Sequence, residues 1–153
     1  MWKTASVLAI CLHASSLQAC KFPFEPSFSA ASAKATLRGW PVLVIFTGSD
    51  WSLRSVTLDK DLLEHQAIEK LIETSFIPVL ADFPQRTKLA TAVQTANADL
   101  AEKYAVTHFP TLIATRADGS EIGRLEFNRE TVDSLMKTLQ DWASQTKPSG
   151  QAK

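Results

Sequence analysis

Pro41-Val-Leu-Val-Ile-Phe46, followed by Thr47-Gly48-Ser49-Asp50, is the stretch on which the expected fold depends. An uninterrupted apolar run rich in β-branched residues is typical of a strand buried on both faces. The polar segment ends the strand, and Ser49 or Asp50 is a suitable N-cap for a following helix. The stretch therefore predicts a central strand that leads through a short turn into a helix.

The segments on either side are expected to alternate between helix and strand. Ser27 can cap a helix that extends to about Arg38 and is ended by Gly39. Apolar spacing predicts a second helix from Val56 to Thr74, with an interruption near His65-Gln66. The remaining expected elements are a strand over Phe76–Phe83, a helix over Lys88–Tyr104 with a joint at Asn97, strands over Thr111–Thr115 and Glu121–Phe127, and a last helix capped by Asn128.

This order predicts an α/β fold with one mixed, four-stranded sheet flanked by helices, including an N-terminal helix. Helical crossovers are expected to make the first strands parallel, and the Asp118-Gly119 turn makes the last pair antiparallel. Pro78 cannot donate to a strand ladder, so its strand belongs at an edge. The sheet order second, first, third, fourth satisfies these conditions.

Composition narrows the functional classes. The length of 153 residues suits one domain. Equal numbers of basic and acidic residues, 16 of each, argue against nucleic-acid binding. Two cysteines are too few for a disulfide scaffold, and no Cys/His cluster predicts a metal site. We expect neither a metal nor a cofactor.

The N-terminus has the parts of an export signal. Lys3 supplies a charged start, Ala5–Leu12 is a short apolar run, and small residues precede Cys20. Leu17-Gln-Ala-Cys20 resembles a bacterial lipobox, in which the signal is removed and the cysteine is lipid-modified. A short buried helix is the alternative interpretation of the apolar run.

The export interpretation divides the chain into four parts and places the protein in the periplasm as a lipoprotein attached to the membrane through Cys20. These parts are a signal peptide over residues 1–19, a tether over 20–26, a folded domain over 27–146 and a flexible tail over 147–153.

Five segments resemble exported bacterial thioredoxin-like proteins in order and spacing, over roughly residues 36–143. They are Phe46-Thr-Gly-Ser-Asp-Trp51, Asp82-Phe83-Pro84, Leu100–Val106, Phe109-Pro110-Thr111 and Asp118–Gly123. The resemblance implies a thioredoxin fold with a cis peptide bond before Pro110, facing the active-site helix. It also implies a Trp-Cys-x-x-Cys active site beginning at Trp51.

The chain departs from that family at the catalytic motif. Where the family has Cys-x-x-Cys, this sequence has Ser52-Leu53-Arg54-Ser55. Disulfide exchange needs a thiolate to attack a sulfur atom and a second thiol to resolve the mixed disulfide. Many thioredoxins also carry a buried acid on the first strand, where the nearest residue here is Ile45. The sequence therefore predicts that dithiol–disulfide activity is lost.

The two serines have other interpretations. Both could cap the helix start, or one could be a nucleophile served by His108, although no orienting acid is evident from the sequence. A metal site built from His65 and His108 is disfavoured because the fold separates them. Arg54 is either a solvated helix residue or a charge presented to a partner.

Trp51, Phe109 and Pro110 are expected to line a groove that holds an extended peptide or an envelope protein by β-augmentation, which needs no cysteine. The alternative is that Trp51 packs over the helix and Phe109 faces the core.

The leading hypothesis is an exported, non-catalytic binding or chaperone-like module. One rival is a thiol-disulfide oxidoreductase with residual or partner-assisted activity, for which Cys20 would have to escape lipidation. Another is that Ser52 and Ser55 are engineered replacements for cysteines; the signal-like N-terminus favours a natural sequence.

Overall fold

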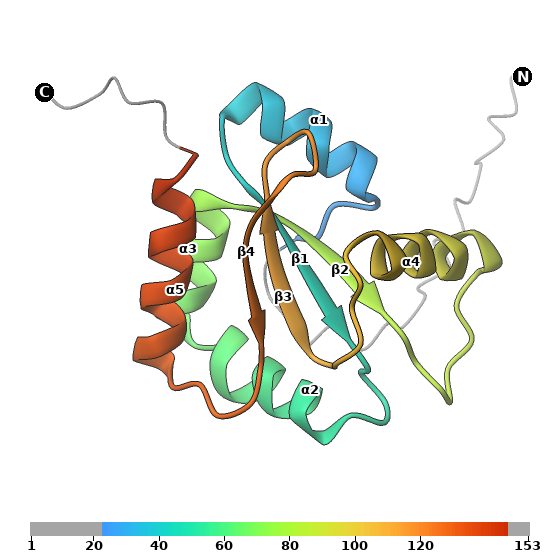
Figure 1. Ribbon diagram of the computed structural model, residues 1–153. Helices are drawn as coiled ribbons and strands as arrows, with labels where there is room; N and C mark the ends of the chain where they lie inside the picture. Colours follow the sequence, from blue (N-terminus) through green and yellow to red (C-terminus); the bar gives the residue numbers. More distant parts are fainter. Residues whose placement is uncertain (1–22, 147–153) are drawn as a thin grey trace, which may run out of the picture.

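The computed structural model describes residues 23–146 and has a four-stranded sheet with helices on both faces (Figure 1). Cys20 and the expected signal and tail lie outside these residues. The elements are α1 (Phe28–Arg38), β1 (Val42–Thr47), α2 (Leu53–Thr57), the π-helical segment η1 (Leu58–Leu63), α3 (Gln66–Ser75), β2 (Ile77–Asp82), α4 (Thr91–Lys103), β3 (Thr111–Thr115), β4 (Glu121–Glu126) and α5 (Val132–Ser144).

The strand order β2-β1-β3-β4 confirms the order expected from the sequence. Strand β1 pairs with β2 in parallel and with β3 antiparallel, and β3 pairs with β4 antiparallel. The expectation that both helical crossovers give parallel strands is wrong for the second crossover. Strand β2 ends with Asp82 opposite Thr47, and β3 begins with Thr111 opposite Phe46. The connection through α4 therefore returns to the end of the sheet where β2 stopped, so β3 runs antiparallel to β1.

Strand β1 contributes to a core on each side of the sheet, as its continuous apolar pattern predicts. Leu43 and Ile45 pack with residues of α3 and α5, including Ile72 and Leu139. Val42, Val44 and Phe46 pack on the opposite face with residues of α1 and with Tyr104, which follows α4. Because successive strand side chains point to opposite faces, an unbroken apolar run is what a central strand between two helical layers requires.

Helix α1 begins and ends at the expected residues. The Ser27 side chain accepts a hydrogen bond from the Ala30 N–H, and Gly39 ends the helix with a left-handed φ of 65°. Before the helix, the Glu25 N–H donates to the Pro78 carbonyl at 2.9 Å. Glu25 thereby forms an isolated parallel bridge with Val79 of β2. The edge strand that contains Pro78 is therefore partly covered.

Helix α4 differs from its expected form because Asn97 is not a joint. The helix begins at Thr91 and continues without a break to Lys103. Asn97 is buried on the inner side, where its Nδ2 donates to the Asp82 carbonyl at 2.8 Å. The expectation of a joint at Asn97 is wrong because the hydrogen-bond partner of this side chain, the Asp82 carbonyl, is 15 residues away in sequence.

The last helix is capped by Thr131, three residues after the expected cap at Asn128. Thr131 and Ser134 each accept a hydrogen bond from the other residue's backbone N–H, which completes a capping box. The Asn128 N–H instead donates to the Glu130 carboxylate at 2.7 Å. The core-facing positions of this helix, Leu135, Leu139 and Trp142, are buried as predicted.

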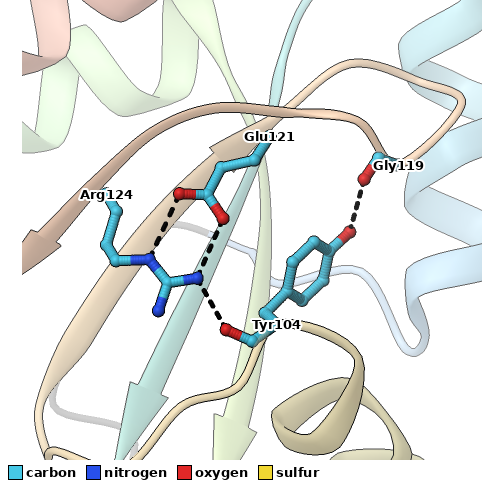
Figure 2. A network of polar contacts seen from close by, with 4 residues as sticks. All are labelled: Tyr104, Gly119, Glu121 and Arg124. Atoms are coloured by element: carbon cyan, nitrogen blue, oxygen red, sulfur yellow. Dashed lines mark hydrogen bonds and ion pairs between the residues drawn. The ribbon is translucent and has the colours of Figure 1, made fainter.

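A polar network joins the end of α4 to the β3–β4 hairpin (Figure 2). The Tyr104 hydroxyl donates to the Gly119 carbonyl at 3.0 Å, while Arg124 donates to the Tyr104 carbonyl at 2.6 Å and to both oxygens of Glu121. The hydrogen bonds to Glu121 raise the pKa of Arg124. Because the chain passes from Tyr104 to the loop before β3, the network fixes the start of that loop.

Candidate functional site

Ser52 and Ser55 lie where β1 turns into α2. Ser52 is the N-cap, in place of the expected Ser49 or Asp50, and its Oγ accepts the Ser55 N–H at 3.2 Å. The Ser55 Oγ accepts the Gly48 N–H at 3.1 Å, so the Ser55 side chain stabilises the preceding turn and does not cap the start of α2. Ser52 is 7% exposed and Ser55 2% exposed. The serine motif is thus a buried part of the strand-to-helix turn.

The Ser52 hydroxyl also reaches the loop before β3. It donates to the Phe109 carbonyl at 3.4 Å, across 57 residues of sequence. The Phe109–Pro110 peptide bond is cis, which confirms the expectation taken from the family resemblance. Pro110 is buried and Phe109 half-buried. The residues at the degenerate motif and the cis-proline therefore come together.

A serine–histidine pair is not formed within residues 23–146. The His108 Nδ1 lies 3.0 Å from Thr107 Oγ1 and 3.6 Å from Glu126 Oε2. An acid beside His108 was not expected from the sequence, but both side chains are exposed. Neither serine hydroxyl bonds to the imidazole, so the arrangement lacks the nucleophile–base contact that serine hydrolysis needs.

Ser49 holds the turn to the end of β2, and Asp50 holds it to the loop after β2. Ser49 donates its N–H and its hydroxyl to the Asp82 carboxylate, at 3.0 and 2.6 Å. The Asp50 carboxylate accepts the N–H groups of residues 85, 86 and 87 at 2.7–3.0 Å. These bonds, that from Gln85 foremost, lower the pKa of Asp50. Both side chains thus position the site rather than cap the helix.

Trp51 lies over the turn in contact with two other aromatic residues. Its indole Nε1 donates to the Phe83 carbonyl at 2.7 Å, and its ring meets Phe109 edge-on at 5.9 Å between centroids. The Phe83 and Phe109 rings are 5.1 Å apart. We call Trp51, Phe83 and Phe109 the aromatic cluster. Trp51 remains 42% exposed, so the cluster presents apolar surface to solvent.

Two members of this site were missed by sequence reasoning. Phe83 was placed only as the end of a strand, although its motif with Asp82 and Pro84 was recognised. A Cβ added to Gly48 would lie 2.5 Å from the Trp51 ring, so glycine is required for the indole to pack over the turn. A glycine directly after the strand, three residues before a tryptophan, was the available signal.

The remaining predicted site residues lie as follows. Arg54 is exposed and forms no ion pair with any residue between 23 and 146, and its neighbour Leu53 is 81% exposed. His65 is at the N-cap of α3, and His108 lies in the loop between α4 and β3. The described part of the chain contains no cluster of metal-ligating side chains. It also contains no helix long and apolar enough to cross a membrane.

The chain belongs to the thioredoxin-like domain family, whose pattern matches residues 28–138. It is similar to the disulfide bond reductase DsbH of Chlamydia pneumoniae, with 29% identity over 87 residues, 57% of this chain and 52% of that protein. The thioredoxin-related protein DsbJ of the same organism is 28% identical over 100 residues, 65% of this chain and 29% of that protein. The chain therefore spans about half of the first relative and under a third of the second.

Solved structures support the same fold. A DsbH oxidoreductase structure superposes with a TM-score of 0.75 at 22% identity, covering 87% of this chain and 92% of that one. A thioredoxin from Thermus thermophilus gives a TM-score of 0.61 at 20% identity, covering 82% and 90%. The thioredoxin-like fold predicted from the sequence is thus confirmed.

Proposed function

We propose that this protein is a thioredoxin-fold binding module that has lost dithiol–disulfide chemistry and acts as a peptide-binding or chaperone-like protein of the cell envelope. One observation carries the proposal. The hydroxyls of Ser52 and Ser55, at the positions of the two cysteines, are buried and hydrogen-bonded to backbone atoms of three chain segments. They serve the shape of the site and supply no sulfur.

The surroundings of the motif support the loss of redox chemistry. Ile45, at the position nearest the buried acid of many thioredoxins, is 1% exposed and packed in the core. A hydroxyl cannot form the mixed disulfide through which thiol exchange proceeds. The site therefore keeps the scaffold of a disulfide enzyme without a redox-active group.

The aromatic cluster supports the binding role. Trp51 is a large aromatic side chain held by a hydrogen bond and by Phe109, yet 42% exposed. Tryptophan is enriched at interaction hot spots because it buries much apolar area with little loss of conformational freedom. An extended peptide laid beside Phe109 and Pro110 would cover this ring, with Arg54 exposed nearby for an acidic group.

Export and lipid attachment complete the proposal. Two residues separate the lipobox-like sequence ending at Cys20 from the first described residue, Pro23, and Glu25 is held against β2. A lipid on Cys20 would keep the domain close to the membrane surface. Mass spectrometry of the mature N-terminus tests this part. An N-terminus without lipid would contradict the proposed attachment through Cys20.

The binding role is tested by capture of proteins from envelope extract, using the natural chain and a Trp51→Ala variant. We expect the variant to lose most captured partners. A Leu37→Ala variant is the matched control, since it removes an apolar side chain that is 87% exposed on α1. Equal capture by the natural chain and the Trp51→Ala variant would contradict the proposal.

A disulfide oxidoreductase with residual or partner-assisted activity is the second candidate. It is favoured by the name of the relative DsbH, a disulfide bond reductase. Reduction of insulin disulfides by the natural chain decides between the two. We expect no turnover above the dithiothreitol background; clear turnover would favour the oxidoreductase.

A further inference from the structure

The described chain begins at the end of the domain that is remote from Trp51. Pro23 borders a hollow whose walls come from the last turns of α1 and α3 and from the start of β2. Glu25 pairs in parallel with β2, so the residues before it lead toward Ile77, the first residue of that strand. The chain that precedes Pro23 therefore joins the domain at this end.

Two contacts of Glu25 fix this first segment to the domain. Its N–H donates to the Pro78 carbonyl at 2.9 Å, and its carboxylate forms an ion pair with Lys34 of α1. Cys20 comes three residues before Pro23. Three residues span at most about 11 Å, so a lipid on Cys20 would hold Pro23 within about 11 Å of the point of attachment.

The same end of the domain exposes apolar and cationic side chains. Leu37, in the last turn of α1, is 87% exposed, more than any other large hydrophobic side chain among residues 23–146. Arg38 is also exposed, and its guanidinium lies 4.9 Å from the centre of the half-buried Trp40 ring. We call Leu37, Arg38 and Trp40 the α1-end surface. Leucine, arginine and tryptophan are typical of proteins at a membrane interface, where apolar side chains enter the acyl boundary and cations reach the phosphates.

The charges beside this surface are balanced. Lys34 and Arg38 line the hollow next to Pro23 together with Glu25 and Glu73. The hollow therefore carries no net charge that would exclude either zwitterionic or anionic headgroups. Contact with lipid depends on the exposed leucine and on the short link to Cys20.

The aromatic cluster lies at the other end of β1. Helix α1 precedes the first residue of β1, whereas Trp51 and α2 follow its last residue (Figure 1). A strand rises about 3.3 Å per residue, so the six residues Val42–Thr47 place the two ends about 17–20 Å apart. A domain that rests on its α1 end would hold Trp51 away from the membrane.

We propose that the α1-end surface docks on the membrane, with Leu37 at the acyl boundary, and that the aromatic cluster faces away from it. This inference rests on the proposed lipid attachment at Cys20. It adds which end of the domain meets the lipid and which end is open to a peptide.

The orientation is tested with the lipidated protein, purified from membranes after expression of the full chain. Leu37→Cys and Leu53→Cys are each labelled with bimane, since the proposed processing removes Cys11 and acylates Cys20. Leu53 is the matched control, because it is 81% exposed and begins α2 at the opposite end of the domain. Each protein is placed in vesicles of phosphatidylethanolamine and phosphatidylglycerol that contain a phosphatidylcholine with a nitroxide below its headgroup.

We expect the nitroxide to quench the label at residue 37 about twofold or more, since a side chain at the acyl boundary lies at the depth of the nitroxide. The label at residue 53 should keep the emission that it has in vesicles without nitroxide. Equal quenching of the two labels, stronger quenching at residue 53, or no quenching of either label would overturn the proposed orientation.

This inference and the proposed function can fail separately. If Cys20 carries a lipid but the label at residue 37 is not quenched, the attachment stands and the orientation is wrong. If Cys20 carries no lipid, the orientation fails together with the attachment. If the label at residue 37 is quenched as expected but capture is insensitive to Trp51→Ala, the orientation stands and the peptide-binding role is wrong. Leu37 remains a suitable control for capture, because it lies at the opposite end of the domain from Trp51.

Discussion

The Ser55 hydroxyl accepts the Gly48 N–H at 3.1 Å, so the first turn of α2 holds the end of β1 in place. Ser55 is 2% exposed, and its own N–H donates to the Ser52 Oγ. The chain Gly48–Ser55–Ser52–Phe109 therefore links the strand, the helix and the cis-proline loop by successive hydrogen bonds. In this protein, the two motif positions have become structural supports.

Replacing Ser55 by alanine is expected to lower the free energy of unfolding by about 1–3 kcal/mol, because the buried Gly48 N–H loses its acceptor. Urea denaturation measures the loss. Ser29→Ala, at an exposed position of α1, is the control and should be neutral or slightly stabilising. Equal midpoints for the natural chain and Ser55→Ala would show that the bond contributes nothing.

The double substitution Ser52→Cys/Ser55→Cys is expected to produce insulin-disulfide reductase activity, whereas we expect none from the natural chain. A cysteine at the Ser52 N-cap would lie at a helix start, where the N–H groups favour the thiolate. The Ser52→Ala/Ser55→Ala variant controls for the loss of the hydroxyls and should stay inactive. An inactive, folded cysteine variant would show that the site has lost more than its sulfur atoms.

Gly48→Ala is expected to displace the Trp51 indole, since the added Cβ would lie 2.5 Å from that ring. The indole would lose its bond to the Phe83 carbonyl and become more exposed, which shifts its fluorescence to longer wavelength. Capture of envelope proteins should fall as it does in Trp51→Ala. The same glycine substitution made in the Trp51→Ala background should leave the emission unchanged, and a shift there would assign the effect to another tryptophan.

Asp50→Asn is expected to reduce stability in a pH-dependent way. The N–H groups of Gln85, Arg86 and Thr87 hold the pKa of Asp50 below its ordinary value of 3.8. A lowered folded-state pKa stabilises the fold above the unfolded-state pKa, and this stabilisation is lost as the pH falls through the folded-state value.

The difference in urea midpoint between the natural chain and Asp50→Asn should therefore be constant at neutral pH and shrink below about pH 4. Asp99→Asn, at an exposed position on α4, is the control and should show no such shrinkage. An undiminished difference at acid pH would mean that the carboxylate charge does not hold the loop.

Gly123→Ala is expected to destabilise the packing of β4 against α5. The added Cβ would lie 2.1 Å from the Trp142 Nε1, and Trp142 is only 6% exposed, so one of them must shift. Overpacking of this kind costs about 1–3 kcal/mol. Thermal or urea denaturation measures the loss, and combining the change with Trp142→Phe should recover part of it. Strictly additive effects would show that the two residues do not compete for space.

The fold was predictable because each main element carries a local signal. The apolar run of β1 and the Ser27 and Gly39 limits of α1 predicted these elements, and the Asp118-Gly119 turn and the position of Pro78 led to the sheet order. The errors concern polar residues whose hydrogen-bond partners the sequence pattern does not reveal. Asn97 looked like a helix break until Asp82 was known to lie beside it, and Asn128 looked like a cap although Glu130 binds its N–H.

The sequence by itself determined the order of strands and helices and the serines at positions 52 and 55, since periodicity and residue identity are local properties. Tertiary structure alone decided that Ser52 reaches Phe109, that Asp50 binds the loop at residues 85–87, and that the Trp51 indole donates to the Phe83 carbonyl. These contacts join segments 32 to 57 residues apart. Packing of the sheet and helices brings these segments together, and no periodic pattern in the sequence predicts which of them make contact.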